Sequence, residues 1–167
     1  GYLDYPNCPS LPKSLPFLKH TLALIEVLRV AGPYMSDTSP CVRKGCSMCC
    51  RETVMPITAV EASRLARRTG MSEDQFCSSD ENGIRRLLNN QDTRACVFLA
   101  TSSDVPSAPG ICSVYESRPL GCKTYPVILN EAALAILDDL CPHTGEFEQP
   151  NEDDIHLLLN LEERLKR

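Results

Sequence analysis

The chain has 167 residues, a net charge of −5 and ten cysteines. A chain of this length buries about two-thirds of its unfolded surface, so it needs neither disulfides nor a metal to acquire a core. The acidic balance argues against a nucleic-acid partner, and no apolar run, residues 22–25 included, is long enough to span a membrane.

We expect one domain over residues 1–167. Residues 1–16 are rich in proline and tyrosine, which predicts an extended lead-in. Apolar side chains then recur at helical spacing over residues 17–32, which predicts a helix that ends at Gly32-Pro33. The N-terminus lacks the sections of a signal peptide, so we expect a reducing, cytoplasmic environment in which cysteines act as ligands or redox groups.

The predicted metal-binding core spans residues 40–142. Within it, Thr58 and Glu61 have the spacing of a capping box, which predicts a helix that runs to about Thr69 and ends at Gly70. Other short elements are expected: a helix at 82–90, strands at 96–99 and 123–130, and either a strand or a helix at 132–139.

The last expected element is an amphipathic helix over residues 151–166 that docks on the body through its apolar face. The predicted fold class is therefore mainly α with few short strands, an α+β fold with a minor β part. It forms a small single domain whose cysteine-rich loops are organised around a metal centre.

Four of the ten cysteines lie within ten residues, at Cys41, Cys46, Cys49 and Cys50. A soluble fold has little structural reason for such a cluster, whereas thiolates from a short loop can converge on one metal at small entropic cost. Adjacent side chains tend to diverge, so Cys49 and Cys50 either serve different metals or leave one thiol in reserve for redox chemistry.

Four further cysteines complete a set of eight candidates: Cys96, Cys112, Cys122 and Cys141. Eight thiolates suit two four-cysteine centres, or one centre with spare thiols. His143 is an alternative ligand. We interpret Cys8 as an unremarkable thiol and Cys77 as a small buried hydrophobe, because neither follows a recurring spacing.

The combination of Cys46-x2-Cys49-Cys50 with Tyr115-Glu116-x-Arg118-Pro119-x2-Cys122 resembles the zinc- or iron-chelating cysteine-cluster family, often called CxxCxxCC. The resemblance covers residues 40–142. The chain departs from the common pattern in two places: four residues separate Cys41 from Cys46 where two are usual, and Ser47 replaces a frequent glycine.

The resemblance implies a metal centre. The relatives of this family that have a known activity are the flagellin lysine N-methylases. Carried over to this sequence, the metal ligands are Cys41, Cys46, Cys49, Cys50, Cys96, Cys112, Cys122 and Cys141. Arg118 and Lys123 are expected just outside these thiolates, where a cation lowers thiol pKa values and offsets the charge of the centre. Alternatively, Arg118 pairs with Glu116 or a helix end.

Spacing does not separate zinc from iron. The dispersed ligands and the excess of thiols over one tetrahedral zinc site favour an iron–sulfur cluster, with 4Fe–4S first, over zinc. The expected function is electron transfer, sensing, or metal and cluster handling, with a protein redox or delivery partner. The alternative is a zinc-binding protein or a metal-dependent enzyme with methyltransferase-like activity.

Overall fold

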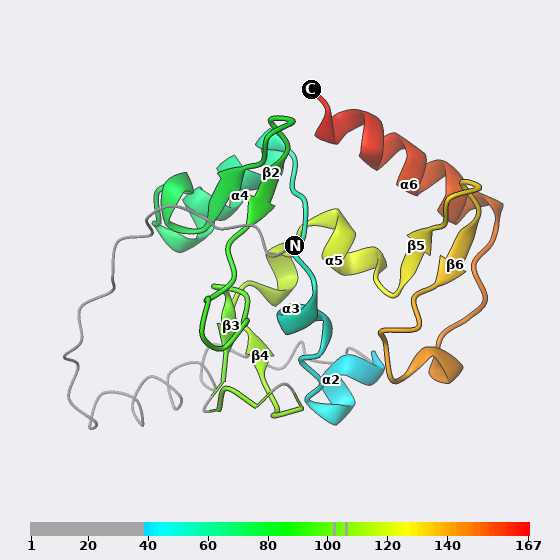
Figure 1. Cartoon of the computed structure of the whole chain (residues 1–167), viewed down its shortest axis with the longest axis horizontal. Coiled ribbons are helices and arrows are strands. Elements are labelled where there is room, and N and C mark those ends of the chain that lie inside the picture. The colour runs from blue at the N-terminus through cyan, green and yellow to red at the C-terminus, as the bar shows by residue number, and fades with distance from the viewer. Residues whose placement is uncertain (1–38, 102, 106) are drawn as a thin grey trace. The chain divides into compact units, whose positions relative to one another are not determined.

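The computed structural model describes residues 39–101, 103–105 and 107–167 (Figure 1). The chain divides into two units, Gly1–Asp37 and Thr38–Arg167, and the described residues belong to the second. The predicted lead-in at 1–16, the predicted helix at 17–32 and Cys8 lie outside the described residues.

The described residues form five α-helices: α2 (Pro40–Lys44), α3 (Cys49–Glu52), α4 (Ala59–Thr69), α5 (Leu120–Thr124) and α6 (Glu152–Leu165). Three single turns of 3-10 helix accompany them: η1 (Glu73–Gln75), η2 (Tyr115–Ser117) and η3 (Thr144–Glu146). Only α4 and α6 are long enough to present an extended face, because each of the other three helices has four or five residues.

Six short strands pair into three separate antiparallel hairpins: β1 (Cys77–Ser79) with β2 (Arg85–Leu87), β3 (Leu99–Ala100) with β4 (Ile111–Cys112), and β5 (Val127–Leu129) with β6 (Ala135–Leu137). In register, Cys77 lies opposite Leu87, and Leu99 lies opposite Cys112.

The prediction of a mainly α fold was wrong. The described residues are 38% helix and 15% strand, and three small sheets take up much of the chain between α4 and α6. The helix predicted at 82–90 forms β2 instead, because Asp80 closes a turn ahead of it. Its Oδ1 accepts hydrogen bonds from the N–H groups of Asn82 at 2.9 Å and Ile84 at 3.0 Å, and Gly83 takes a φ of 77°.

The same turn chemistry recurs before β6. Asn130 Oδ1 accepts from the N–H groups of Ala132 and Leu134, both at 3.0 Å. Residues 132–139, left open between strand and helix, therefore contain β6. The strand predicted at 123–130 is shorter than expected, because α5 continues to Thr124 and β5 begins only at Val127.

Helix α4 begins and ends as predicted. The Thr58 hydroxyl accepts from Glu61 N–H at 3.3 Å, while Glu61 Oε2 accepts from Thr58 N–H at 2.8 Å, which completes the capping box. Gly70 ends the helix at a φ of 72°, where a side chain would be strained. The buried face of α4 carries Leu65, which is fully enclosed.

The core lies where α4 meets the β1–β2 hairpin and the segments around β3 and β4. It consists of Ile57, Ala62, Leu65, Phe76, Cys77, Leu87, Phe98 and Val114. The rings of Phe76 and Phe98 lie with centroids 5.4 Å apart. Cys77 is buried in this core, which confirms its interpretation as a small hydrophobe.

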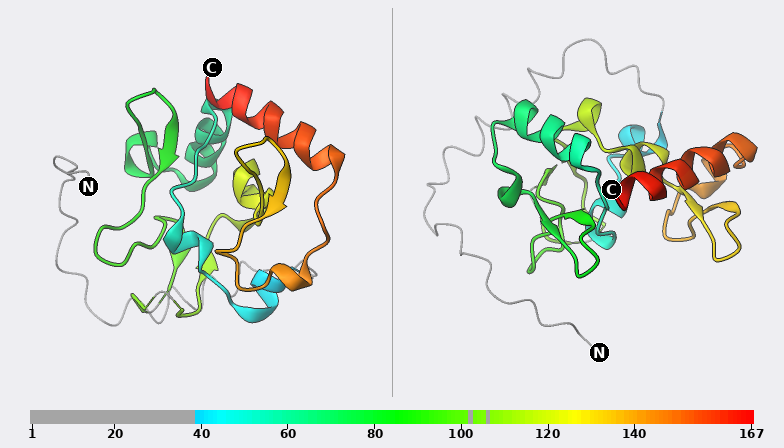
Figure 2. Two further views of the ribbon diagram at one scale, coloured as in Figure 1. Left: turned by 45° about the vertical axis from the view of Figure 1, so that its right-hand side comes forward. Right: turned by 90° about the horizontal axis from the view of Figure 1, so that it is seen from above.

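Helix α6 packs against β5 and β6 (Figure 2). The Asn151 side chain caps it by accepting from Asp153 N–H at 2.8 Å. Leu158 and Leu161 are buried, whereas Leu159 is 37% exposed. Among the described helices, none has both the length and the apolar character needed to cross a membrane.

The enclosed position of Leu65 generates a stability prediction. Leu65→Ala should lower the free energy of unfolding by about 2–5 kcal/mol, because it leaves a cavity in a packed core. The matched control is Val60→Ala on the same helix, where the side chain is 67% exposed. We expect the control to change stability by less than about 0.5 kcal/mol in urea unfolding. Equal losses for the two variants would contradict this core.

Candidate metal centre

The four clustered cysteines lie on two short helices joined by a tight turn. Cys41 is the second residue of α2, and Gly45 ends that helix at a φ of 60°. Cys46 N–H then donates to the carbonyl of Cys41 at 2.9 Å. The long interval between Cys41 and Cys46 is therefore one helical turn, which returns Cys46 to the start of α2.

Cys49 and Cys50 open helix α3 and remain partly exposed. The carbonyl of Cys50 accepts from Cys96 N–H at 2.7 Å, which attaches a distant segment to the cluster. The pKa of Cys49 is raised, first by its hydrogen bond with the Cys50 thiol and then by burial. The two adjacent cysteines thus interact with each other in the metal-free protein.

A buried arginine braces the loop that carries these thiols. Arg51 is only 1% exposed. Its Nε donates to the Ser47 hydroxyl at 3.2 Å, and one of its terminal nitrogens donates to the Thr101 hydroxyl at 2.9 Å and the Ser103 carbonyl at 2.8 Å. Ser47 in turn donates to the carbonyl of Ala108 at 2.7 Å. These bonds hold Thr101, Ser103 and Ala108 against the cysteine turn.

The other terminal nitrogen of Arg51 is buried and has no hydrogen-bond partner among the described residues. A buried cation without a counter-charge is costly, and Arg51 directly follows Cys50 in the chain. Thiolates held by a metal carry excess negative charge. The donor set at this loop therefore fits a negatively charged thiolate centre better than neutral thiols.

Three further cysteines lie at the edge of the core, and we call them the core-edge thiols: Cys96, Cys112 and Cys122. Burial raises the pKa of Cys96 to about 11, and the charges of Cys112 and Cys49 add to the effect. Burial also raises the pKa of Cys122, followed by the charges of Cys96, Cys112 and Cys49. Each of these thiols is therefore harder to deprotonate when its neighbours are ionised.

Cys49 also belongs to a second group of cysteines. We call the other members of this group the loop thiols: Cys41, Cys46 and Cys141. Burial raises the pKa of Cys41, and the charges of Cys49, Cys46 and Cys141 raise it further. The pKa of Cys141 is raised by burial, and then by Cys46 and Cys49. The eight candidates are therefore not one uniform set, because Cys49 interacts with two different neighbourhoods.

In the part of the chain that the structure describes, no three Cys, His, Asp or Glu side chains are close enough to hold one metal ion. All nine described cysteines are free thiols. Metal binding by these thiols requires their deprotonation.

Arg118 lies beside the core-edge thiols. Its guanidinium carbon is 3.4 Å from the centroid of the Tyr115 ring, and its Nε donates to the Tyr115 carbonyl at 2.8 Å. The charge of Arg118 lowers the pKa values of Cys112 and Cys122 against the dominant effect of burial. Glu116, its alternative partner, forms no ion pair with Arg118 within the described ranges.

The other predicted polar residues lie elsewhere. Lys123 is exposed on α5 and lines a cavity with side chains of α4 and α6. His143 Nδ1 lies 3.9 Å from Glu146 Oε1. Sequence reasoning missed Arg51, and the only signal for it was its position directly after the double cysteine.

Comparison with known proteins agrees with this cysteine-centred site. The sequence model of the CxxCxxCC family, with the description "Putative zinc- or iron-chelating domain", matches residues 40–142, more than half of the chain. No curated protein and no solved structure matches significantly.

The bracing role of Arg51 generates a second stability prediction. Arg51→Leu should lower the free energy of unfolding by about 2 kcal/mol, because it removes the hydrogen bonds that Arg51 donates to Ser47, Thr101 and Ser103. Arg68→Leu, an exposed cation on α4, is the matched control. If the two variants unfold at the same denaturant concentration, Arg51 does not brace the loop.

The raised thiol pKa values predict a pH dependence for the metal-free protein. The pKa of a cysteine in an unfolded chain is about 8.5. In the folded protein, burial raises the pKa of Cys96 to about 11. Between these values the folded state binds more protons than the unfolded state, so stability falls as pH rises through this window.

Urea unfolding at a series of pH values across the window checks this dependence. Cys96→Ala should show a shallower decline, since one of the raised groups is removed. A stability that stays constant or increases with pH would contradict the burial of these thiols.

Proposed function

This chain belongs to the CxxCxxCC family, and we propose that Cys49, Cys96, Cys112 and Cys122 hold an iron–sulfur cluster of the 4Fe–4S type. The observation that carries the proposal is that Cys96, Cys112 and Cys122 gather at the edge of one core, and that Cys96 N–H donates to the carbonyl of Cys50, the neighbour of Cys49, at 2.7 Å. Four thiolates are the usual ligand set of such a cluster.

The origin of the ligands favours iron–sulfur over zinc. The four thiols come from α3, the segment before β3, β4 and α5, whereas structural zinc sites usually combine two local cysteine pairs. The three loop thiols are further donors, which a single four-cysteine centre does not need. They are either a second metal site or spare ligands. Zinc on the same thiolates is the second candidate, and the family description favours it equally.

Arg118 would offset part of the charge of the bound centre. Four thiolates exceed the charge of the metal they bind, and a cation nearby stabilises them and tunes the potential of a cluster. The ring of Tyr115 and the backbone bond at Nε hold the guanidinium in place, so the offset would not require a new ion pair.

A bound iron–sulfur cluster would supply one-electron redox chemistry. The partly exposed cysteines favour a centre that a partner protein can approach, and thus a function in electron transfer, sensing or cluster handling in the cytoplasm. The similarity to flagellin lysine N-methylases, and with it a methyltransferase-like activity, stays a prediction from the resemblance.

Anaerobic purification followed by a visible spectrum and by iron, zinc and sulfide analysis tests the proposal. We expect a coloured protein with equal amounts of iron and acid-labile sulfide. Cys122→Ser should lose most of both. Cys77→Ser is the matched control. Burial is the main cause of the raised pKa of Cys77, and no other cysteine contributes to it.

A colourless wild-type protein that contains zinc and no sulfide would replace the cluster with a zinc site. Unchanged iron in Cys122→Ser would remove this residue from the ligand set. Cys46→Ser addresses the loop thiols: loss of additional metal with an intact cluster would identify a second centre.

A further inference from the structure

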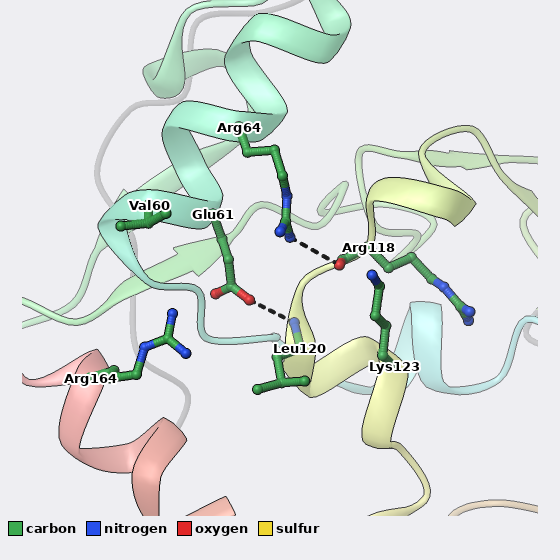
Figure 3. Close-up of a pocket in the computed structure, with 7 residues that line it drawn as sticks. All are labelled: Val60, Glu61, Arg64, Arg118, Leu120, Lys123 and Arg164. Atoms are coloured by element: carbon green, nitrogen blue, oxygen red, sulfur yellow. Dashed lines mark hydrogen bonds between the residues drawn. The ribbon is translucent and has the colours of Figure 1, made fainter. Parts of the chain in front are cut away.

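A cavity of about 200 Å³ lies where α4, α5 and α6 approach one another (Figure 3). Four basic residues line it. Three come from different helices, Arg64 from α4, Lys123 from α5 and Arg164 from α6, and the fourth is Arg118, whose guanidinium stacks on the Tyr115 ring. Glu61 is the one carboxylate in its wall. A cavity with four basic residues and one carboxylate is unexpected in a chain with a net charge of −5.

The cations from the three helices have no counter-charge among the described residues. Several cations elsewhere in the described chain form ion pairs: Arg43 and Lys44 with Glu146, Arg85 with Glu73, Arg86 with Asp80, and Arg94 with Glu52. Arg64, Lys123 and Arg164 pair with none of the described carboxylates. The cavity therefore gathers positive charge that no described ion pair offsets.

Glu61 does not neutralise this charge through an ion pair, because neutral donors occupy its carboxylate. Its Oε2 accepts from the N–H and the hydroxyl of Thr58, at 2.8 and 2.9 Å, and its Oε1 accepts from Leu120 N–H at 2.7 Å. These bonds fix the carboxylate in the wall, and Figure 3 shows the bond to Leu120.

Hydrogen bonds hold the Arg64 side chain in place, but not all of its N–H groups have a partner among the described residues. One terminal nitrogen donates to the carbonyls of Ser117 at 3.4 Å and Arg118 at 3.2 Å, the second of which Figure 3 shows. Its Nε is buried and has no partner among the described residues. The side chains of Lys123 and Arg164, by contrast, are exposed and form no hydrogen bond or ion pair with any described residue, so both are available to a ligand.

We propose that this cavity binds a phosphate group, either as free phosphate or as the monoester of a small molecule. A planar carboxylate is matched by a single arginine fork, whereas donors from three separate helices suit a tetrahedral anion with several terminal oxygens. The volume is below the roughly 300–1,000 Å³ of sites for drug-sized ligands, which suits one phosphoryl group with a small organic part. The proposal does not rest on the proposed metal centre, although Arg118 lies in the cavity wall and beside the core-edge thiols.

The test is calorimetric titration of the purified full chain with inorganic phosphate and with glycerol 3-phosphate. We expect Lys123→Glu and Arg164→Glu each to weaken binding at least about tenfold, through loss of a charge-assisted contact. The matched controls are Arg68→Glu on α4 and Lys166→Glu, which make the same change of charge outside the cavity. Both controls should bind within about twofold of wild type.

Tighter binding of glycerol 3-phosphate would identify a monoester as the ligand, and equal binding would identify free phosphate. Either result supports the site. Equal weakening by the controls, binding of acetate as tight as that of phosphate, or no binding by wild type would overturn it. Loss of metal in Cys122→Ser should leave phosphate binding unchanged, which separates this test from that of the metal centre.

Discussion

The buried carboxylate of Glu61 is the constraint that joins the start of α4 to the segment that carries Cys122. A buried charge persists only where hydrogen bonds replace water, and Glu61 is 5% exposed. Its bonds to Thr58 begin α4, whose Leu65 fills the core. Its third bond, to Leu120 N–H, attaches α5, which carries Cys122. One side chain therefore determines both where a helix starts and where a candidate ligand lies.

The segment around Arg118 connects two features of opposite charge. Its guanidinium lowers the pKa values of Cys112 and Cys122, while its carbonyl accepts from Arg64 in the wall of the cavity. Thiolates bound to a metal and an anion in the cavity would thus act on the same short stretch of chain. The guanidinium of Arg118 stacks on the Tyr115 ring. Arg64, Lys123 and Arg164, by contrast, form no ion pair with any described residue.

Local chemistry explains which elements were predictable. The capping box of α4 involves residues three apart in sequence, so its spacing is sufficient to identify it. The residues at 82–90 have an ambiguous apolar pattern, and their pairing with β1 depends on the turn at Asp80. Strand pairing decided against the helix, since the segment gains hydrogen bonds and burial of Leu87 from a partner outside its own window.

The sequence by itself determined the family, the eight candidate cysteines and the capped helix, because each rests on residue type and short spacing. Only the tertiary structure decided that Cys49 interacts with two groups of thiols and that Arg51 is buried. It also decided that cations of three helices meet at one cavity. The physical reason is that burial and charge coupling depend on distances in space between segments far apart in sequence, and no local pattern encodes those distances.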